Sequence, residues 1–188
     1  MILAKYQVGI TTTGQERLLQ ATNGDRSLLP VLCRRCAAMA RSNPALTIGR
    51  EEVTNAIRWF QATEAERYPP LSETVRALED SPINLLNVVQ LLRNGPTPRR
   101  LLNLALHTVV DELQLTGAVR VESRDLEQIY AIRNEIYADY LRKHFHPARV
   151  VRVLTLAGLW DEAIQYLEAL VRTDPTQRAP LLAVTVDS

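Results

Sequence analysis

The hydrophobic pattern of this chain changes from helical to alternating after residue 115, and that change limits the folds that the chain can adopt. Two short segments, Ala118–Glu122 and Gln128–Ile132, alternate between apolar and polar residues, as strands with one buried face do. The polar segment SRDLE between them is typical of a turn. The sequence therefore predicts a β-hairpin in a chain whose other segments mostly have helical spacing.

Helices are expected on both sides of this hairpin, at residues 74–78, 84–92, 99–115 and 134–145. Gly117 stands at the end of the third of these helices, where a left-handed residue is wanted before the first strand. Three helices, a hairpin and a further helix is the element order of a winged-helix domain. We therefore expect a winged-helix domain over residues 71–147, with the hairpin as its wing.

Residues 1–70 are expected to form a small helical bundle. Its helices are predicted at residues 14–22 and 27–41, and from residue 49 to about residue 67. In the last of them, Val53, Ile57 and Phe60 recur at helical spacing and form an apolar face. Pro69 and Pro70 should stop this helix and extend the chain, because proline lacks an N–H donor.

The start of the first helix has a second possible interpretation, since Gly9 and Gly14 have the spacing of a phosphate-binding loop. Such a loop needs a Lys and then a Ser or Thr after its second glycine, and this chain has Gln15 and Glu16 there. A helix start accounts for the same residues, with Thr13 and Glu16 as a capping box. The pattern favours the helix start.

Residues 148–188 begin with a predicted pair of helices. The segment GLWDEAIQYLEALVRTDP, residues 158–175, closely resembles the second half of a tetratricopeptide repeat. One unit of a helical repeat cannot bury its own apolar face, so this hairpin should pack on a neighbour. The expected fold class is mainly α: a helical bundle plus a winged-helix domain with a small β-hairpin wing, then an α-hairpin.

Composition and motifs exclude several functional classes. Lys and Arg total 22 against 21 Asp and Glu, so no overall charge attracts the chain to nucleic acid or membrane. No apolar run could span a bilayer and the N-terminus does not read as a secretory signal, so we expect no membrane partner and a cytoplasmic location. Cys33 and Cys36 are expected to be free thiols. We assign no catalytic, cofactor-binding or metal-binding residue, and expect no enzyme activity.

Three stretches resemble the STAND-type signal-transduction ATPases, which are AAA-like proteins. LLQATNGDRSLLPVLCRRC is similar to their helical lid, with Gly24 in its turn. ELQLTGAVRVE and YAIRNEIYADYLRKHF look like the winged helix that follows the lid, and end in a signature of Arg133, Asn134, Ile136 and Tyr137. Together with the lid they cover most of residues 13–145.

The nucleotide core of that family is missing from this sequence, which has no Gly-rich loop with a Lys and no apolar strand ending in acidic residues. The resemblance therefore implies a fragment of a larger regulatory ATPase. Its partners would be the nucleotide-binding core and the downstream domains of that parent. Lid and winged helix would move as rigid bodies with nucleotide state. We expect Arg133, Asn134 and Tyr137 to hold the wing against its own last helix.

An alternative interpretation is a winged-helix regulator that binds DNA. The candidate contacts with DNA, or with another partner, are Arg99, Arg100, Arg120 and Arg124. The third helix is poorly equipped to read bases, because Asp111 and Glu112 would face phosphates. DNA binding predicts a salt-dependent affinity that falls when Arg99 and Arg100 are changed to Ala.

Overall fold

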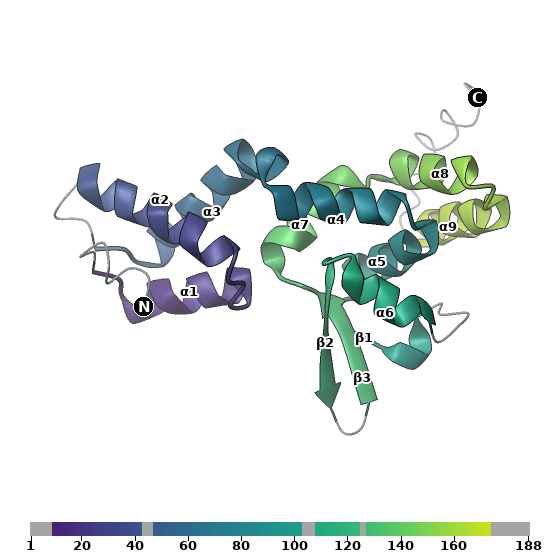
Figure 1. The fold of residues 1–188 in the computed structure, drawn as a ribbon, viewed down its shortest axis with the longest axis horizontal. Coiled ribbons are helices and arrows are strands. Elements are labelled where there is room, and N and C mark those ends of the chain that lie inside the picture. The colour runs from purple at the N-terminus through teal and green to yellow at the C-terminus, as the bar shows by residue number, and fades with distance from the viewer. Residues whose placement is uncertain (1–8, 43–46, 103–107, 125–126, 174–188) are drawn as a thin grey trace. The chain divides into compact units, whose positions relative to one another are not determined.

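The computed structural model describes residues 9–42, 47–102, 108–124 and 127–173, and over these residues the chain is mainly helical with one small antiparallel sheet (Figure 1). The chain divides into two compact units. The first unit contains residues 1–72 and 133–140, and the second contains residues 73–132 and 141–188. The expected domain boundaries fall after residues 70 and 147, whereas these units cluster residues 133–140 with the N-terminal bundle and residues 141–188 with the sheet.

The first unit is a helical bundle. Its elements are α1 (Thr12–Thr22), α2 (Leu28–Ser42), α3 (Arg50–Thr63), the 3-10 turn Ala65–Arg67, and the first residues of both α4 (Pro69–Glu79) and α7 (Glu135–His144). Helix α3 packs on both α1 and α2. Val53, Ile57 and Phe60 are buried on its inner face, which confirms the predicted apolar face. Leu28 and Leu32 of α2 are also fully buried.

The start of α1 is fixed by pairing with a segment that is distant in sequence. The Thr11 N–H donates to Ile48 O at 2.9 Å, and the Ile48 N–H donates to Gly9 O at 3.1 Å. The Thr11 side chain accepts from the Gly14 N–H at 3.1 Å and is the N-cap. The predicted cap at Thr13 was therefore wrong by two residues, because long-range pairing with Ile48 decides where the helix begins.

The two prolines do not extend the chain as predicted. They are the first residues of α4, and only Tyr68 before them is extended, at φ −85° and ψ 109°. The N–H groups of a first helical turn have no intrahelical acceptor, so proline loses nothing there and its fixed φ suits the helix. Pro69 and Pro70 thus separate two helices by opening the second.

The second unit contains the sheet and the C-terminal helices. Besides the remainder of α4 and α7, its elements are α5 (Pro82–Asn94), β1 (Thr97–Pro98), the 3-10 turn Arg99–Leu101, α6 (Thr108–Leu115), β2 (Val119–Arg124), β3 (Glu127–Ile132), α8 (Pro147–Leu156) and α9 (Trp160–Thr173). The helix predicted from 99 to 115 is interrupted. Leu102 is extended and only 5% exposed, so its burial overrides the helical pattern.

The three strands are antiparallel, in the order β1-β3-β2. Tyr130 of the central strand pairs with Val121 of β2 and with Thr97 of β1, and its side chain is fully buried. The predicted hairpin is confirmed. Its strands are longer than expected, because β2 continues to Arg124 and β3 begins at Glu127.

Gly24 and Gly117, the two glycines expected at turns, both have positive φ. Gly24 has φ 72° and follows Asn23, which is also left-handed, directly after α1. Gly117 has φ 73° and lies between α6 and β2, as the sequence predicted. Both positions favour glycine because a Cβ would strain a left-handed backbone.

Candidate functional site

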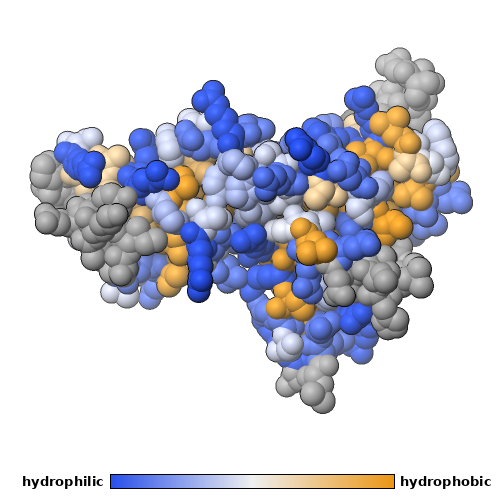
Figure 2. All heavy atoms as spheres, in the orientation of Figure 1, coloured by the Kyte–Doolittle hydropathy of each residue, from blue (hydrophilic) through white to orange (hydrophobic). Residues whose placement is uncertain are grey.

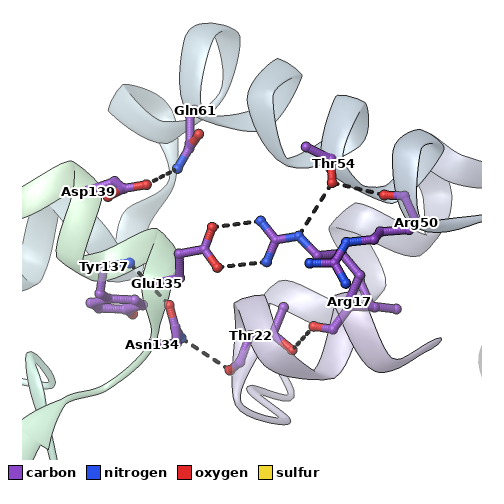
Figure 3. A network of polar contacts seen from close by, with 10 residues as sticks. Arg17, Thr22, Arg50, Thr54, Gln61, Asn134, Glu135, Tyr137 and Asp139 are labelled. Carbon is purple, nitrogen blue, oxygen red and sulfur yellow. Dashed lines mark hydrogen bonds and ion pairs between the residues drawn. The ribbon is translucent and has the colours of Figure 1, made fainter. Parts of the chain in front are cut away.

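A network of polar contacts in the first unit joins the start of α7 to the N-terminal bundle (Figure 3). Arg17 of α1 and Glu135 of α7 form a bidentate ion pair, with Nη1 to Oε2 at 2.7 Å and Nη2 to Oε1 at 2.6 Å. Their side chains are 11% and 37% exposed. We call Arg17, Asp25, Arg133, Asn134 and Glu135 the α7 anchor.

The ion pair keeps both of its members charged. The hydrogen bonds from the Arg17 guanidinium lower the pKa of Glu135 against the opposing effect of burial. The same hydrogen bonding raises the pKa of Arg17. The Arg17 Nε also donates to Thr54 Oγ1 of α3 at 3.4 Å, so one guanidinium contacts two other helices.

Asn134 connects α7 to the end of α1 with a single amide. Its Oδ1 accepts from the Tyr137 N–H at 3.1 Å, which caps the first turn of α7. Its Nδ2 donates to Thr22 O at 3.2 Å. The residue is only 7% exposed, and a buried amide needs hydrogen-bond partners on both of its polar atoms. The geometry therefore suits Asn better than a residue with only one kind of polar atom.

Asp25 connects the other end of the anchor to α2. Its Oδ2 lies 2.8 Å from Arg133 Nε, while its Oδ1 accepts from the backbone N–H groups of Ser27 and Leu28. The Arg133 guanidinium also lies 5.3 Å from the centre of the Tyr137 ring, within cation–π range. One carboxylate thus caps the start of α2 and neutralises the arginine that follows β3.

Helix α7 makes further contacts with the bundle after its first turn. Gln61 Nε2 donates to Asp139 Oδ2 at 3.0 Å, and the Tyr140 hydroxyl lies 3.3 Å from Glu66 Oε2. Tyr137 is fully buried and Tyr140 is 6% exposed. The anchor is therefore the first part of a longer contact between α7 and the bundle.

The signature residues and the two turn glycines that the sequence analysis singled out do not all lie in the same unit. Gly24, Arg133, Asn134 and Tyr137 all belong to the first unit, whereas Gly117 belongs to the second. We expected Arg133, Asn134 and Tyr137 to hold the wing against α7. The described contacts of Arg133 and Asn134 outside α7 instead run to Asp25 and Thr22 of the bundle, because the chain leaves the sheet at Ile132 and residues 133–140 cluster with the N-terminal bundle.

Two residues of the anchor gave no signal in the sequence. Arg17 and Glu135 lie 118 residues apart, and each on its own reads as an ordinary charged residue of an amphipathic helix. Asp25 did carry a local signal, since an Asp after an Asn-Gly turn and before a helix is a common cap.

The wing arginines are paired with polar groups of the wing itself. Arg120 and Arg124 both form ion pairs with Glu122, the second at 2.6 Å. Arg100 Nε lies 3.1 Å from Glu127, and Arg99 donates to Gln128 at 3.2 Å. The four candidate DNA contacts are thus close together in one unit, and carboxylates offset much of their charge.

The two cysteines of α2 are free thiols, as expected, and both are buried, an environment in which a thiol is unreactive. Burial raises the pKa of Cys36 to about 12, and it raises the pKa of Cys33 as well.

We expect iodoacetamide at pH 8 to label neither thiol at a measurable rate in the folded chain, and to label both in denaturant. Mass spectrometry measures this, and rapid native labelling of Cys36 would contradict it.

In the part of the chain that the structure describes, no group of three or more His, Cys, Asp or Glu side chains could hold a metal ion. None of the helices described is both long and apolar enough to cross a membrane.

Comparison of the chain with models of protein families, with curated proteins and with solved structures found no match.

Proposed function

We propose that this chain is a non-catalytic regulatory module from a larger, cytoplasmic signal-transduction ATPase of the STAND kind. It would pass on the nucleotide state of that parent by rigid-body movement. Its partners would be the nucleotide-binding core and the domains that follow it. The observation that supports this most is the α7 anchor, which joins the lid-like bundle to the residues directly after β3.

The anchor supports the proposal because of its geometry. A bidentate pair between Arg and a carboxylate fixes direction as well as distance. Arg17 and Glu135 form such a pair, and Asn134 adds a hydrogen bond to the end of α1. A displacement of α1 must therefore displace residues 133–135 or break these contacts. A lid that responds to nucleotide would in this way act on the segment that follows the wing.

The first test is to sequence the genomic DNA on both sides of the region that encodes these 188 residues, and to translate it in the same reading frame. We expect an open frame upstream that encodes a Gly-rich loop with a Lys, followed by an apolar strand that ends in acidic residues. Stop codons on both sides would overturn the proposal and make binding by the winged helix alone the leading idea.

The second test uses the longer protein that contains both parts. Hydrogen exchange of the amides in residues 133–140 is compared with ADP and with ATP bound. We expect a nucleotide-dependent difference that Arg17→Ala removes. Arg124→Ala is the matched control, because Arg124 belongs to an exposed ion pair of the wing. A difference that persists unchanged in Arg17→Ala contradicts the role of the anchor.

For DNA we expect only weak binding, in the non-specific range of about 10⁻⁴–10⁻⁶ M at physiological salt. The reason is that Glu122 and Glu127 offset much of the wing's positive charge. Fluorescence anisotropy with duplex DNA at several salt concentrations measures this. Changing Arg99 and Arg100 to Ala should leave the affinity nearly unchanged. Tight binding that this double variant abolishes would favour the DNA-binding alternative.

A further inference from the structure

The end of the C-terminal hairpin exposes three large apolar side chains. Leu156 at the end of α8 is 77% exposed, Trp160 at the start of α9 is 62% exposed, and Ile164 one turn later is 55% exposed. We call these three residues the hairpin patch. Figure 2 shows apolar side chains at the surface over α8 and α9. Single exposed apolar residues are ordinary, but grouped ones typically mark a contact surface.

An open groove adjoins the hairpin patch within the second unit. Its volume is about 1370 Å³, and Leu156 and Trp160 are part of its lining. Pro82 and Val153 add apolar surface to it, and its charged lining residues are Glu79, Asp80, Arg149 and Arg152. The groove has room for an apolar side chain of a partner next to the patch. The surface is therefore both concave and apolar, which favours a partner that inserts a protruding apolar side chain.

Two charges flank the hairpin patch on different helices. Arg152 lies one turn before Leu156 on α8, and Asp161 follows Trp160 on α9; both are exposed. Neither side chain has an ion pair with the residues that the structure describes. Arg149 of α8, by contrast, is paired with Glu79 at 2.6 Å. Within the described part of the chain, the patch thus has a cation without an ion pair on its α8 side and a carboxylate without an ion pair on its α9 side.

We propose that the hairpin patch binds the same patch of a second copy of this chain, as a two-fold symmetric dimer. In a two-fold contact the α8 side of one copy meets the α9 side of the other. Arg152 of each copy then faces Asp161 of the other, around a centre of apolar side chains. A partner surface with a single sign of charge would oppose one of these residues with a like charge. A second copy of the chain places an opposite charge against Arg152 and against Asp161 in the same contact.

Sedimentation of the full chain over a range of concentrations tests the proposal. We expect a monomer–dimer equilibrium, and we expect Leu156→Glu to raise the dimer dissociation constant at least about tenfold, because a charge would be buried at the apolar centre. Leu19→Glu is the matched control, since Leu19 is 56% exposed on α1 and lies outside the patch. Circular dichroism verifies that both variants fold.

A charge swap tests the two-fold arrangement itself. Arg152→Asp and Asp161→Arg should each weaken the dimer, because each places like charges opposite one another at two symmetric points. The double variant with both changes should regain most of the original affinity. A double variant no better than the single ones overturns the arrangement. A chain that stays monomeric at every concentration overturns the dimer, and assigns the patch to another segment or to a different protein.

Discussion

Arg17→Ala should lower the free energy of unfolding by about 2 kcal/mol, as measured by urea denaturation. Removing one member of a buried ion pair costs about 3–5 kcal/mol, because the remaining charge loses its partner without regaining water. Arg17 is largely buried, with a side chain 11% exposed, but Glu135 is 37% exposed and can be partly hydrated after the change. The expected loss is therefore smaller than for a fully buried pair.

The control for this prediction is a second Arg–Glu pair in the same chain. Arg172 and Glu168 lie 2.9 Å apart on α9, and their side chains are 78% and 56% exposed. Arg172→Ala should change the free energy of unfolding by less than about 0.5 kcal/mol, as expected of a solvated helix pair. Equal losses for Arg17→Ala and Arg172→Ala would show that the anchor is no stronger than a surface pair.

The dependence of the unfolding free energy on pH tests whether the negative charge of Glu135, rather than the packing of its side chain, stabilises the Arg17–Glu135 pair. The pKa of Glu135 is lower in the folded chain than in the unfolded chain, mainly because Arg17 donates hydrogen bonds to it. The pair's contribution is therefore complete above the unfolded pKa of about 4.3, and it is lost as the pH falls through the lowered folded pKa. Accordingly, Glu135→Gln should be less stable than the original chain at pH 7, and the difference should shrink in acid.

Local signals predicted most of the secondary structure but not the contacts between distant segments. Alternation over 118–132 predicted the hairpin, and helical spacing predicted the buried face of α3 around Ile57. The two-residue strand β1 was missed, because Thr97 and Pro98 are too few to show a period and pair with β3 only in the folded chain. Periodicity is a property of neighbours in sequence, so it cannot reveal such pairing.

The contacts of the α7 anchor are likewise of two kinds: those between residues close in sequence, which could be predicted, and those between distant residues, which could not. Asn134 is part of the sequence signature. Its hydrogen bond from the Tyr137 N–H, which caps α7, joins residues three positions apart and is predictable from a local pattern. Its second hydrogen bond, to Thr22 O, joins residues 112 positions apart. The Arg17–Glu135 pair is entirely of this second kind. What the sequence lacked was the information that residues 133–140 pack with the N-terminal bundle rather than with the sheet that precedes them.

Gly14→Ala should also destabilise the chain by about 2 kcal/mol, although helix propensity alone predicts the opposite. Within a helix, Ala is favoured over Gly by about 1 kcal/mol. A Cβ on Gly14, however, would lie 2.7 Å from Ile48 O and 3.0 Å from Ile10 Cγ1. Ile48 O cannot move away freely, because it accepts the hydrogen bond from Thr11 N–H. Overpacking costs about 1–3 kcal/mol, and a clash with a hydrogen-bonded backbone oxygen belongs at the upper end of that range. After the helix-propensity gain of about 1 kcal/mol is subtracted, a net loss of about 2 kcal/mol remains.

Gly9→Ala is the control, since a Cβ on Gly9 would have no heavy atom within 4 Å. Thermal unfolding of both variants should show a clear loss of stability for Gly14→Ala and little change for Gly9→Ala. A Gly14→Ala variant more stable than the original chain would mean that the segment around Ile48 yields easily. The two glycines whose spacing resembles a phosphate-binding loop would then be equivalent. The expected difference between them instead assigns Gly14 to close packing of α1 against residues 48–49, a structural requirement that involves no phosphate.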